Sequence, residues 1–434
     1  MSSATPDPRG AAAPLHLERR LGRNSIWKVA GDGSRFLLAL FLLLVARRYG
    51  PAAFGAFSLL YASVIVFSIV ADLGLNLLAT RQIAAHKTDP GPYLRTFFTC
   101  KLAVLPVWVI APVVVCKLAR YPGIGLTLTA LVGASFAMRN LLEFFGAIFS
   151  GFEQIQYEAA LKLTSHVILL VFGGAAMALG LPIAWMGAAM LCGYLVGAVW
   201  GALWCHRKWG LLPLAFHPEG LSIVYAETLP LTAMGAGLAG LGKWNTLALG
   251  FMGVPAAQIG WFSAAEKVIA ALDALPMLVT AASYPVLSDL HKNDPGNFAS
   301  ARARLLKAFL LVGVLTAAGV ALFSRPALQI LYGASYGGAR ASLCLLAVGL
   351  AGAFPSYMLL NILVASGRSA DGARAALAAC AANVLLTLAL IPAWGIAGAA
   401  LASSLAQFIL LGAGWAYVAK PQARPLQAFS QASR

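Results

Sequence analysis

Charged and polar side chains inside long apolar segments are the residues of this sequence that could do chemistry. A charge in the hydrocarbon part of a bilayer is costly unless it is paired or hydrated, so each one is a candidate for function. The candidates for binding an anionic substrate are Arg35, Lys28, Arg139, Asn140, Lys243, Asn245 and Lys267. The acidic candidates for ion coupling are Asp32, Glu143, Glu266 and Asp273.

The spacing of these residues predicts which of them share a helix face. Lys28, Asp32 and Arg35 are separated by four and three positions, which places all three on one side of a helix. Arg139 and Glu143 are four apart, and this spacing fits either an ion pair within the helix or the lining of a cavity.

The depth of each charge in its apolar segment indicates whether it is a snorkelling or paired side chain or lines a cavity. Near the segment ends, a snorkelling side chain or a structural ion pair is favoured, and this applies to Lys28, Asp72, Lys101 and Glu227. Cavity lining is favoured for the deeper Arg35, Lys243 and Lys267. Charges concentrate in the first, fourth, seventh and eighth segments, whereas the fifth, sixth, ninth, eleventh and twelfth carry almost none. A hydrated cavity lined by particular helices is therefore expected, and the lone His166 is predicted to be a hydrogen-bonded core residue.

The elements that must position these charges are membrane-spanning helices. Of 434 residues, 60% are hydrophobic and 11% are charged. The mean hydropathy is +0.80, which a soluble domain with a polar shell does not reach. A span needs roughly 20 mostly apolar residues. Such segments cover about 25–46, 54–80, 93–116, 124–150, 158–180, 183–204, 221–251, 256–285, 303–323, 338–366, 373–392 and 396–418. The sequence predicts an all-α integral membrane protein with about 12 transmembrane helices, and the connections are too short for a soluble catalytic domain.

Composition argues against several classes of function. The six cysteines lie in or at the ends of apolar segments and form no CxxC pair, so neither a disulfide framework nor a metal site is expected, and no cofactor is predicted. The formal net charge of +16 is distributed over many connections and does not form one solvated basic face. Nucleic acid is therefore not an expected partner.

Lysine and arginine counts predict the orientation in the membrane. With twelve spans both ends of the chain lie on the same side, where nineteen of these residues fall, Lys162 among them, against six on the opposite side. The excess places both termini in the cytoplasm, with tails at residues 1–23 and 421–434. The first tail has no apolar run before Phe36 and is not expected to be a cleaved signal peptide.

Three internal matches at nearly one offset predict a duplicated chain. His86 to Gly91 returns as His291 to Gly296 after 205 residues, and Pro51 to Ser58 resembles Pro255 to Ser263 at 204. The segment that starts at Leu181 resembles the one at Ile391. The repeat predicts two parallel six-helix bundles, 24–210 and 211–420, around a central cavity. In the HKxDPG loops, capping of the next helix by Asp is favoured over catalysis by a His–Asp pair.

Several of these motifs resemble a known family. They are Arg47-Arg48-Tyr49-Gly50-Pro51 with Phe54-Gly55, Asp72-Leu73-Gly74-Leu75 with Arg81, Tyr284 to Ser288, Ile330 to Gly333 with Tyr336, and Trp394 to Ala400. In order and spacing, over about residues 20 to 418, they resemble the polysaccharide biosynthesis flippases of the multidrug and oligosaccharidyl-lipid exporter superfamily. The resemblance implies a polyprenyl-pyrophosphate-linked oligosaccharide as cargo, moved between leaflets by alternating access. It also implies a bacterial or archaeal inner membrane, contact with membrane lipid, and contact with a polysaccharide polymerase or glycosyltransferases.

Two other functions remain open at this stage. A multidrug or other small-molecule antiporter of the same superfamily would need a cavity dominated by acids, whereas cations at least balance acids here. A membrane glycan-transfer enzyme would need a loop domain or an acidic catalytic motif, and the sequence has neither. The chain is therefore expected to be a transporter and not an enzyme.

Overall fold

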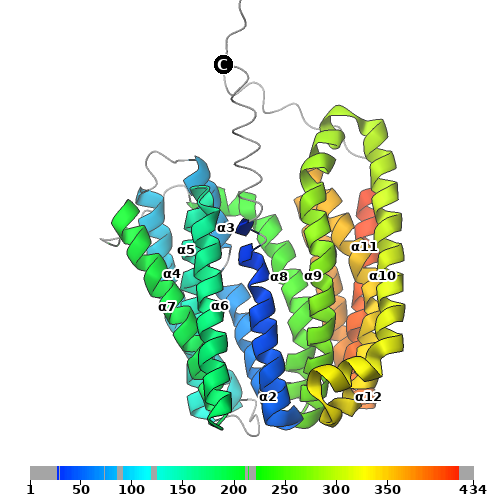
Figure 1. Cartoon of the computed structure of the whole chain (residues 1–434). Coiled ribbons are helices and arrows are strands. Elements are labelled where there is room, and N and C mark those ends of the chain that lie inside the picture. Colours follow the sequence, from blue (N-terminus) through cyan, green and yellow to red (C-terminus); the bar gives the residue numbers. More distant parts are fainter. Residues whose placement is uncertain are drawn as a thin grey trace, which may run out of the picture. The chain divides into compact units, whose positions relative to one another are not determined.

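The computed structural model describes residues 27–28, 30–72, 74–85, 91–118, 125–210, 214 and 221–419, which are mostly helical and contain no strand (Figure 1). The helices are α2 (Arg35–Asp72), α3 (Leu75–Ala85), α4 (Gly91–Leu118), α5 (Leu126–Gly151), α6 (Ile155–Ala178), α7 (Ala184–Trp209), α8 (Leu221–Phe251), α9 (Ala256–Asn293), α10 (Pro295–Tyr332), the 3-10 helix η1 (Ala334–Ala339), α11 (Arg340–Ala365) and α12 (Ser369–Ala419). The all-α prediction is confirmed.

Two of these helices each contain two of the predicted spans. In α2, Gly50 adopts φ 77° and ψ 175°. Glycine tolerates this backbone, so the chain turns there and Pro51 starts a second arm. In α12, Gly395 adopts φ 53° and ψ −129° and separates two arms in the same way. The second predicted span also continues past Gly74, at φ 79°, into α3. With these breaks, the described helices match the twelve predicted spans one by one.

The surface of the helices fits lipid as the solvent. Eight helices of the described residues are long and apolar enough to cross a membrane, and two of them are the broken helices α2 and α12. Large apolar side chains are exposed along these helices, for example Val171 on α6 and Leu311, Leu315 and Leu322 on α10. Such apolar surface would be unfavourable in water, so it indicates contact with lipid chains.

By its packing the chain divides into two units. Unit 1 comprises Met1–Thr232, Lys243–Lys267 and Arg325–Ala341, and unit 2 comprises Ala233–Gly242, Val268–Ser324 and Ser342–Arg434. Helices α8, α9, α10 and α11 therefore contribute residues to both units. The predicted boundary between residues 210 and 211 follows from the sequence repeat and stays a prediction.

Unit 1 is organised around α5, which packs against α3, α4, α6 and α7. Small residues allow the closest of these approaches. A Cβ added at Gly193 would lie 2.5 Å from the carbonyl oxygen of Ser165, and one at Gly201 would lie 2.8 Å from the ring of Phe145. Close helix contact through glycine is typical of membrane bundles, where packing replaces the hydrophobic effect between helices.

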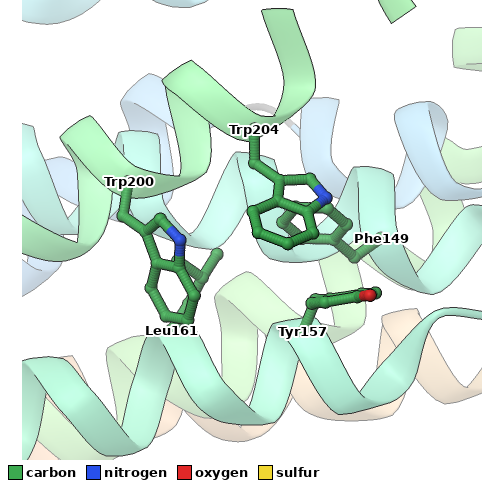
Figure 2. Close-up of a pocket in the computed structure, with 5 residues that line it drawn as sticks. All are labelled: Phe149, Tyr157, Leu161, Trp200 and Trp204. Atoms are coloured by element: carbon green, nitrogen blue, oxygen red, sulfur yellow. The ribbon is translucent and has the colours of Figure 1, made fainter. Parts of the chain in front are cut away.

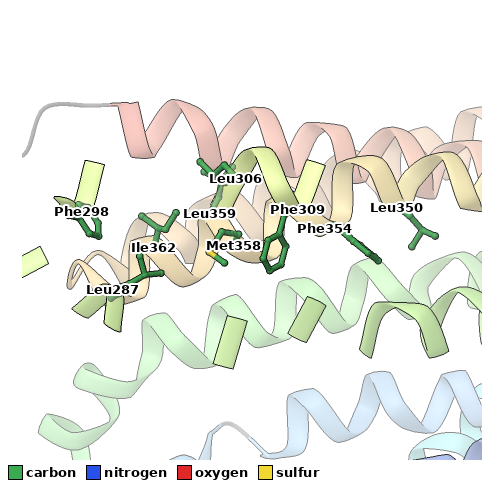
Figure 3. Close-up of a cluster of buried hydrophobic side chains, with 10 residues drawn as sticks. Leu287, Phe298, Leu306, Phe309, Leu350, Phe354, Met358, Leu359 and Ile362 are labelled. Atoms are coloured by element: carbon green, nitrogen blue, oxygen red, sulfur yellow. The ribbon is translucent and has the colours of Figure 1, made fainter. Parts of the chain in front are cut away.

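Unit 2 has an apolar core of its own. Leu287, Phe298, Leu306, Phe309, Leu350, Phe354, Met358, Leu359, Ile362 and Ala365 form one buried cluster (Figure 3). These residues come from α9, α10 and α11, so the cluster holds the three helices together.

The second HKxDPG loop caps a helix, as predicted. Asp294 precedes α10, and its Oδ1 accepts a hydrogen bond from the backbone N–H of Asn297 at 3.0 Å. The bonds from Asn297 hold the pKa of the Asp294 carboxyl below its usual range. The first copy of the loop, at residues 86–90, lies outside the described residues.

Candidate functional site

A series of salt bridges connects the segment just before α2 with α6. Lys28 Nζ lies 2.8 Å from Glu158 Oε1, which also lies 2.6 Å from Lys162 Nζ. Lys162 reaches Asp32 Oδ1 at 3.2 Å, and Asp32 lies 3.8 Å from Arg35. Of the three residues predicted to share a face, Lys28 and Asp32 therefore contact α6, whereas Arg35 contacts Asp32.

Local sequence explains why the two segments approach so closely. A Cβ at Gly31 would lie 2.9 Å from Cα of Ala159, so glycine is the residue that permits this contact. Ser34 donates to the carbonyl of Gly31 and lies 2.8 Å from Nδ1 of His166. The prediction that His166 is a hydrogen-bonded core residue is confirmed.

The assignment of Lys162 to a loop is wrong. Glu158 and Lys162 both lie in α6, although almost no charge is predicted for the interior of the fifth span. The helix begins at Ile155, so both residues belong to its first turns. Their spacing of four positions was the signal that could have identified an ion pair on this helix.

A second ion pair is buried between α2, α4 and α5. Lys101 has no exposed side-chain surface, forms a salt bridge with Asp72, and donates to Oδ1 of Asn140 at 3.0 Å. A structural ion pair is one of the two roles favoured for Lys101 and for Asp72, and the structure shows that they pair with each other. Asn140, predicted to meet substrate, is itself buried and holds this lysine in the structure.

A third pair lies within α5, beside a cluster of aromatic rings. Arg139 Nε lies 2.9 Å from Oε1 of Glu143, and its guanidinium lies 5.3 Å from the ring centroid of Phe136. Tyr61 on α2 packs edge-on against Phe136, with centroids 5.2 Å apart. Arg139 is therefore neutralised by Glu143 and lies beside the ring of Phe136.

The parts of α8 and α9 that belong to unit 1 bring two lysines together. Lys243 forms a salt bridge with Glu266, whose other oxygen accepts from Thr246 at 3.2 Å. Lys267 interacts with the Lys243 side chain and lies 5.3 Å from the ring centroid of Tyr61. Among the described residues Lys267 has no salt bridge of its own. A lysine without a salt bridge beside the Lys243–Glu266 pair forms a site suited to an anion.

Unit 1 therefore brings together all but one of the predicted site residues. Tyr61 packs against Phe136 beside Arg139 and lies 5.3 Å from Lys267, and Glu143 lies within electrostatic range of Lys101 and Lys162, so the clusters are neighbours. Asn245 is buried on α8 in the same unit. The connected groups are seven cations and five carboxylates, an excess of positive charge: Lys28, Arg35, Lys101, Arg139, Lys162, Lys243 and Lys267 with Asp32, Asp72, Glu143, Glu158 and Glu266.

Asp273 is the exception. It lies in the part of α9 that belongs to unit 2. Its Oδ1 is buried and has no hydrogen-bond partner in the described part of the chain. The side chain of Glu227 is not among those that the structure describes. The predicted central cavity stays a prediction.

The repeated segments of the sequence cross each other within unit 1. A Cβ at Gly55 would lie 1.8 Å from the carbonyl oxygen of Ala256, and one at Gly260 would lie 2.0 Å from that of Pro51. The two contacts are reciprocal, because each repeat supplies the glycine at one and the backbone oxygen at the other. Any larger residue at either position would force α2 and α9 apart.

Two of the family-like motifs also contact each other. Arg47 donates to the carbonyl of Ile330 at 3.2 Å, and the hydroxyl of Tyr336 donates to the carbonyl of Ala46 at 2.8 Å. The ring of Tyr336 packs edge-on against Phe54, with centroids 6.4 Å apart. These residues are nearly three hundred positions apart in sequence, so no local pattern could have predicted the contact.

An aromatic hollow lies on unit 1 away from these charges. Trp200 and Trp204 on α7 face Tyr157 and Leu161 on α6, with Phe149 behind them (Figure 2). None of the five lining residues is charged, and none belongs to the predicted site. This hollow is therefore not the candidate substrate site.

Comparison with known proteins identifies the family. A family model described as polysaccharide biosynthesis protein matches residues 21–291, more than half of the chain. The chain belongs to the polysaccharide biosynthesis protein family. The resemblance seen in the sequence motifs is thereby confirmed.

Relatives and solved structures agree with this family and its fold. A protein of Haloferax volcanii called probable low-salt glycan biosynthesis flippase Agl15 is 22% identical over 400 residues, covering 90% of this chain and 81% of that one. An inward-facing multidrug resistance MATE family transporter matches with a TM-score of 0.74 and 15% identity, over 90% of this chain and 93% of its own. The lipid II flippase MurJ in an inward closed conformation matches with a TM-score of 0.71 and 16% identity, and the match covers 91% of this chain and 87% of that one. The chain therefore shares the fold of these transporters and is a multi-pass membrane protein.

Proposed function

We propose that this chain is a flippase that moves polyprenyl-pyrophosphate-linked oligosaccharide from the inner to the outer leaflet by alternating access. Its family and the flippase name of the Haloferax relative support this cargo. The observation that carries the proposal is the excess of cations on membrane helices of unit 1, above all Lys267, which lies beside the Lys243–Glu266 pair and has no salt bridge of its own among the described residues. An excess of cations inside a membrane requires an anionic partner for part of the transport cycle.

The diphosphate is the part of the cargo that these residues would bind. Two ammonium groups side by side can donate to several phosphate oxygens, and Glu266 neutralises one of their two charges when no cargo is bound. The Arg35 side chain is 72% exposed, and its salt bridge among the described residues is with Asp32, at 3.8 Å. Its planar guanidinium is the group that binds phosphate with two hydrogen bonds. Lys28 and Arg139 already have carboxylate partners and would act as supporting charge.

The polar and aromatic candidates would act around the diphosphate. Tyr61 offers a ring beside Lys267 on which a sugar face could lie. Asn140 and Asn245 are buried in this conformation, so they would position neighbouring side chains and meet sugars only after the helices move. The prenyl chain would stay in lipid.

The crossing of α2 and α9 at Gly55 and Gly260 is proposed to close one side of the transport pathway. Alternating access needs a contact that is tight in one conformation and separates in the other. A contact between a glycine and the backbone of the other helix suits this role. It is held by packing alone, so no ion pair is broken when the two helices separate.

Topology and partners complete the proposal. Both termini are proposed to lie in the cytoplasm of a bacterial or archaeal cell, with the chain in the inner membrane beside a polysaccharide polymerase or glycosyltransferases and with no catalytic step of its own. A periplasm-sensitive reporter fused after Lys292 should give a cytoplasmic signal. A periplasmic signal would reverse the orientation.

The direct test is a flipping assay with purified protein in liposomes. The probe is a polyprenyl diphosphate that carries a fluorescent sugar, quenched from outside by a reductant that does not cross the membrane. With the wild-type chain, the reductant should quench the probe from both leaflets, because flipping brings the inner-leaflet probe to the outside. Lys267→Gln and Arg35→Ala should slow the quenching of the inner-leaflet probe at least tenfold. Lys307→Gln, an exposed lysine on α10, is the control and should flip at the wild-type rate.

Two results would contradict the proposal. Unchanged flipping in Lys267→Gln and Arg35→Ala would remove both residues from the binding site. If the wild-type chain failed to flip the diphosphate but exchanged cationic dyes across the same liposomes, the cargo would be that of a multidrug antiporter.

A further inference from the structure

The aromatic hollow of unit 1 lies between α6 and α7 on a surface that faces lipid (Figure 2). Its two indoles, Trp200 and Trp204, are four positions apart on α7, and both are half-buried. Beside them on the same helix, Leu203 is 51% exposed and Val199 is 48% exposed. Exposed apolar side chains on a membrane helix lie against acyl chains. The hollow is therefore adjacent to the hydrocarbon of the bilayer.

Aromatic rings continue from the hollow to the end of α7. The ring of Tyr157, which lines the hollow, lies 4.9 Å from that of Trp204, centroid to centroid. Phe152 stacks on Trp209 with ring centroids 4.1 Å apart. Gly210 then ends α7 in a left-handed conformation, with φ 64° and ψ 65°. Tryptophan and tyrosine are enriched where a helix leaves the hydrocarbon, so this end of α7 lies at a membrane surface.

The last turn of α7 is basic and exposed. It contains His206, Arg207 and Lys208. The salt bridges of the described residues include neither Arg207 nor Lys208. A helix C-terminus carries about half an elementary negative charge and favours cations nearby. That partial charge does not balance two full positive charges, so the turn still attracts an anion.

Lys208 is held at the edge of the hollow. Its Nζ donates to Oε1 of Gln154 at 2.8 Å. The same atom lies 5.2 Å from the ring centroid of Trp209 and 5.7 Å from that of Tyr157. An ammonium group has three N–H donors, and Gln154 uses one of them, so two remain for an anion. Because these contacts already order the side chain, binding costs less conformational entropy than it would at a freely moving lysine.

The spacing along α7 matches the layers of one leaflet. Trp204 and Trp200 precede Lys208 by four and eight positions, which is about 6 and 12 Å along the helix axis. The headgroup region of one leaflet is about 5 to 8 Å thick. With Lys208 at the level of the phosphates, Trp204 lies at the boundary of the hydrocarbon and Trp200 lies beside the first part of the acyl chains. Arg207 is three positions after Trp204 and shares its helix face.

We propose that this face of α6 and α7 binds one anionic phospholipid. The lipid phosphate accepts hydrogen bonds from Lys208 and Arg207, and one acyl chain lies over Trp204 and Trp200. Phosphatidylcholine carries a positive choline group next to its phosphate, which the two cations disfavour. A headgroup with a net negative charge, such as that of phosphatidylglycerol, is therefore preferred. The site does not depend on the proposed flippase function, because none of the cargo-binding candidates belongs to it.

Mass spectrometry of the intact chain tests the site by counting the lipids that stay bound. The chain is released from micelles that contain equal amounts of phosphatidylglycerol and phosphatidylcholine. Wild type should retain one phosphatidylglycerol in preference to phosphatidylcholine. Arg207→Gln and Lys208→Gln should each weaken this preference about fivefold, which corresponds to about 1 kcal/mol for one basic residue near a membrane surface. Lys208→Arg should keep the preference, and Lys307→Gln on α10 is the control and should leave it unchanged.

A second pair of measurements tests the aromatic part of the site. Trp200→Ala should retain long-chain phosphatidylglycerol less well than wild type, because the acyl chain loses an indole contact. The same variant should bind a short-chain phosphatidylglycerol as wild type does, which shows that the fold and the basic turn are intact. Equal retention of the long-chain lipid by Trp200→Ala and wild type would remove the hollow from the site.

Three further results would overturn the lipid site. Equal retention of the two lipids by wild type would make this face a general interfacial belt of aromatic and basic residues. An unchanged preference in the double variant Arg207→Gln/Lys208→Gln would place the bound lipid elsewhere on the protein. Displacement of the lipid by an equal concentration of soluble glycerol phosphate would show that the turn recognises free phosphate and not a phospholipid.

Discussion

Removing the carboxylate of Asp72 should destabilise the protein strongly, because it leaves a buried lysine without its counter-charge. Lys101 has no exposed side-chain surface, and its other acceptor is the neutral Oδ1 of Asn140 at 3.0 Å. Removing one partner of a buried ion pair costs about 3 to 5 kcal/mol. The Asp72 side chain is 24% exposed, and Asn140 remains as an acceptor for the lysine. We therefore expect Asp72→Asn to lie at the lower end of that range, about 3 kcal/mol.

A double-mutant cycle in mixed micelles measures this energy. The unfolding free energy is compared for wild type, Asp72→Asn, Lys101→Met and the double variant. Because the double variant removes both charges, it should be less destabilised than the sum of the single variants, by about 2 kcal/mol. The control, Asp289→Asn, should change stability by less than about 0.5 kcal/mol. An Asp72→Asn variant as stable as the control, or single effects that simply add, would refute the structural role assigned to this pair.

Three more perturbations test separate features. Gly260→Leu should abolish flipping because its side chain would meet a backbone oxygen of α2. Gly319→Leu, whose Cβ meets nothing within 4 Å, should retain flipping. Equal flipping by the two variants would contradict the role proposed for the crossing of α2 and α9. Ser34→Ala leaves the buried Nδ1 of His166 without its partner. It should lower the free energy of unfolding by about 1 to 3 kcal/mol, and an unchanged unfolding curve would argue against that bond. Asp294→Ala should lower the thermal midpoint at neutral pH through the lost helix cap. The folded-state pKa of Asp294 is depressed by its bonds from Asn297. The stabilisation by the ionised Asp294 carboxylate is therefore present above its unfolded-state pKa of about 3.9, and it is lost as the pH falls through its folded-state pKa. A midpoint difference that persisted in strong acid would contradict this.

The helices could be predicted from sequence because apolar length and turn glycines are local signals. Gly50 before Pro51 and Gly395 after Pro392 mark breaks that the described helices contain at the expected places. The Asp-Pro pair at Asp294 likewise predicted the start of α10.

The partners of the charges could not be predicted, since they come from residues distant in sequence. Lys28 and Glu158 are 130 positions apart. A helical period shows which face a residue occupies but not which helix lies opposite. The adjacency of Lys243 and Lys267 and the isolation of Asp273 likewise follow only from packing. For this reason sequence alone grouped Asp273 with three acids that the structure gives cation partners.

The central claim, that the charges of unit 1 bind a diphosphate, is tested most directly by binding of a short-chain prenyl diphosphate to the purified chain in nanodiscs. Wild type should bind the diphosphate and not the matching prenyl alcohol. Loss of one charge-assisted contact, at about 1.5 to 3 kcal/mol, should weaken binding at least about tenfold in Lys267→Gln and leave Lys307→Gln unchanged. Equal affinity for diphosphate and alcohol, or wild-type affinity in Lys267→Gln, would contradict the account.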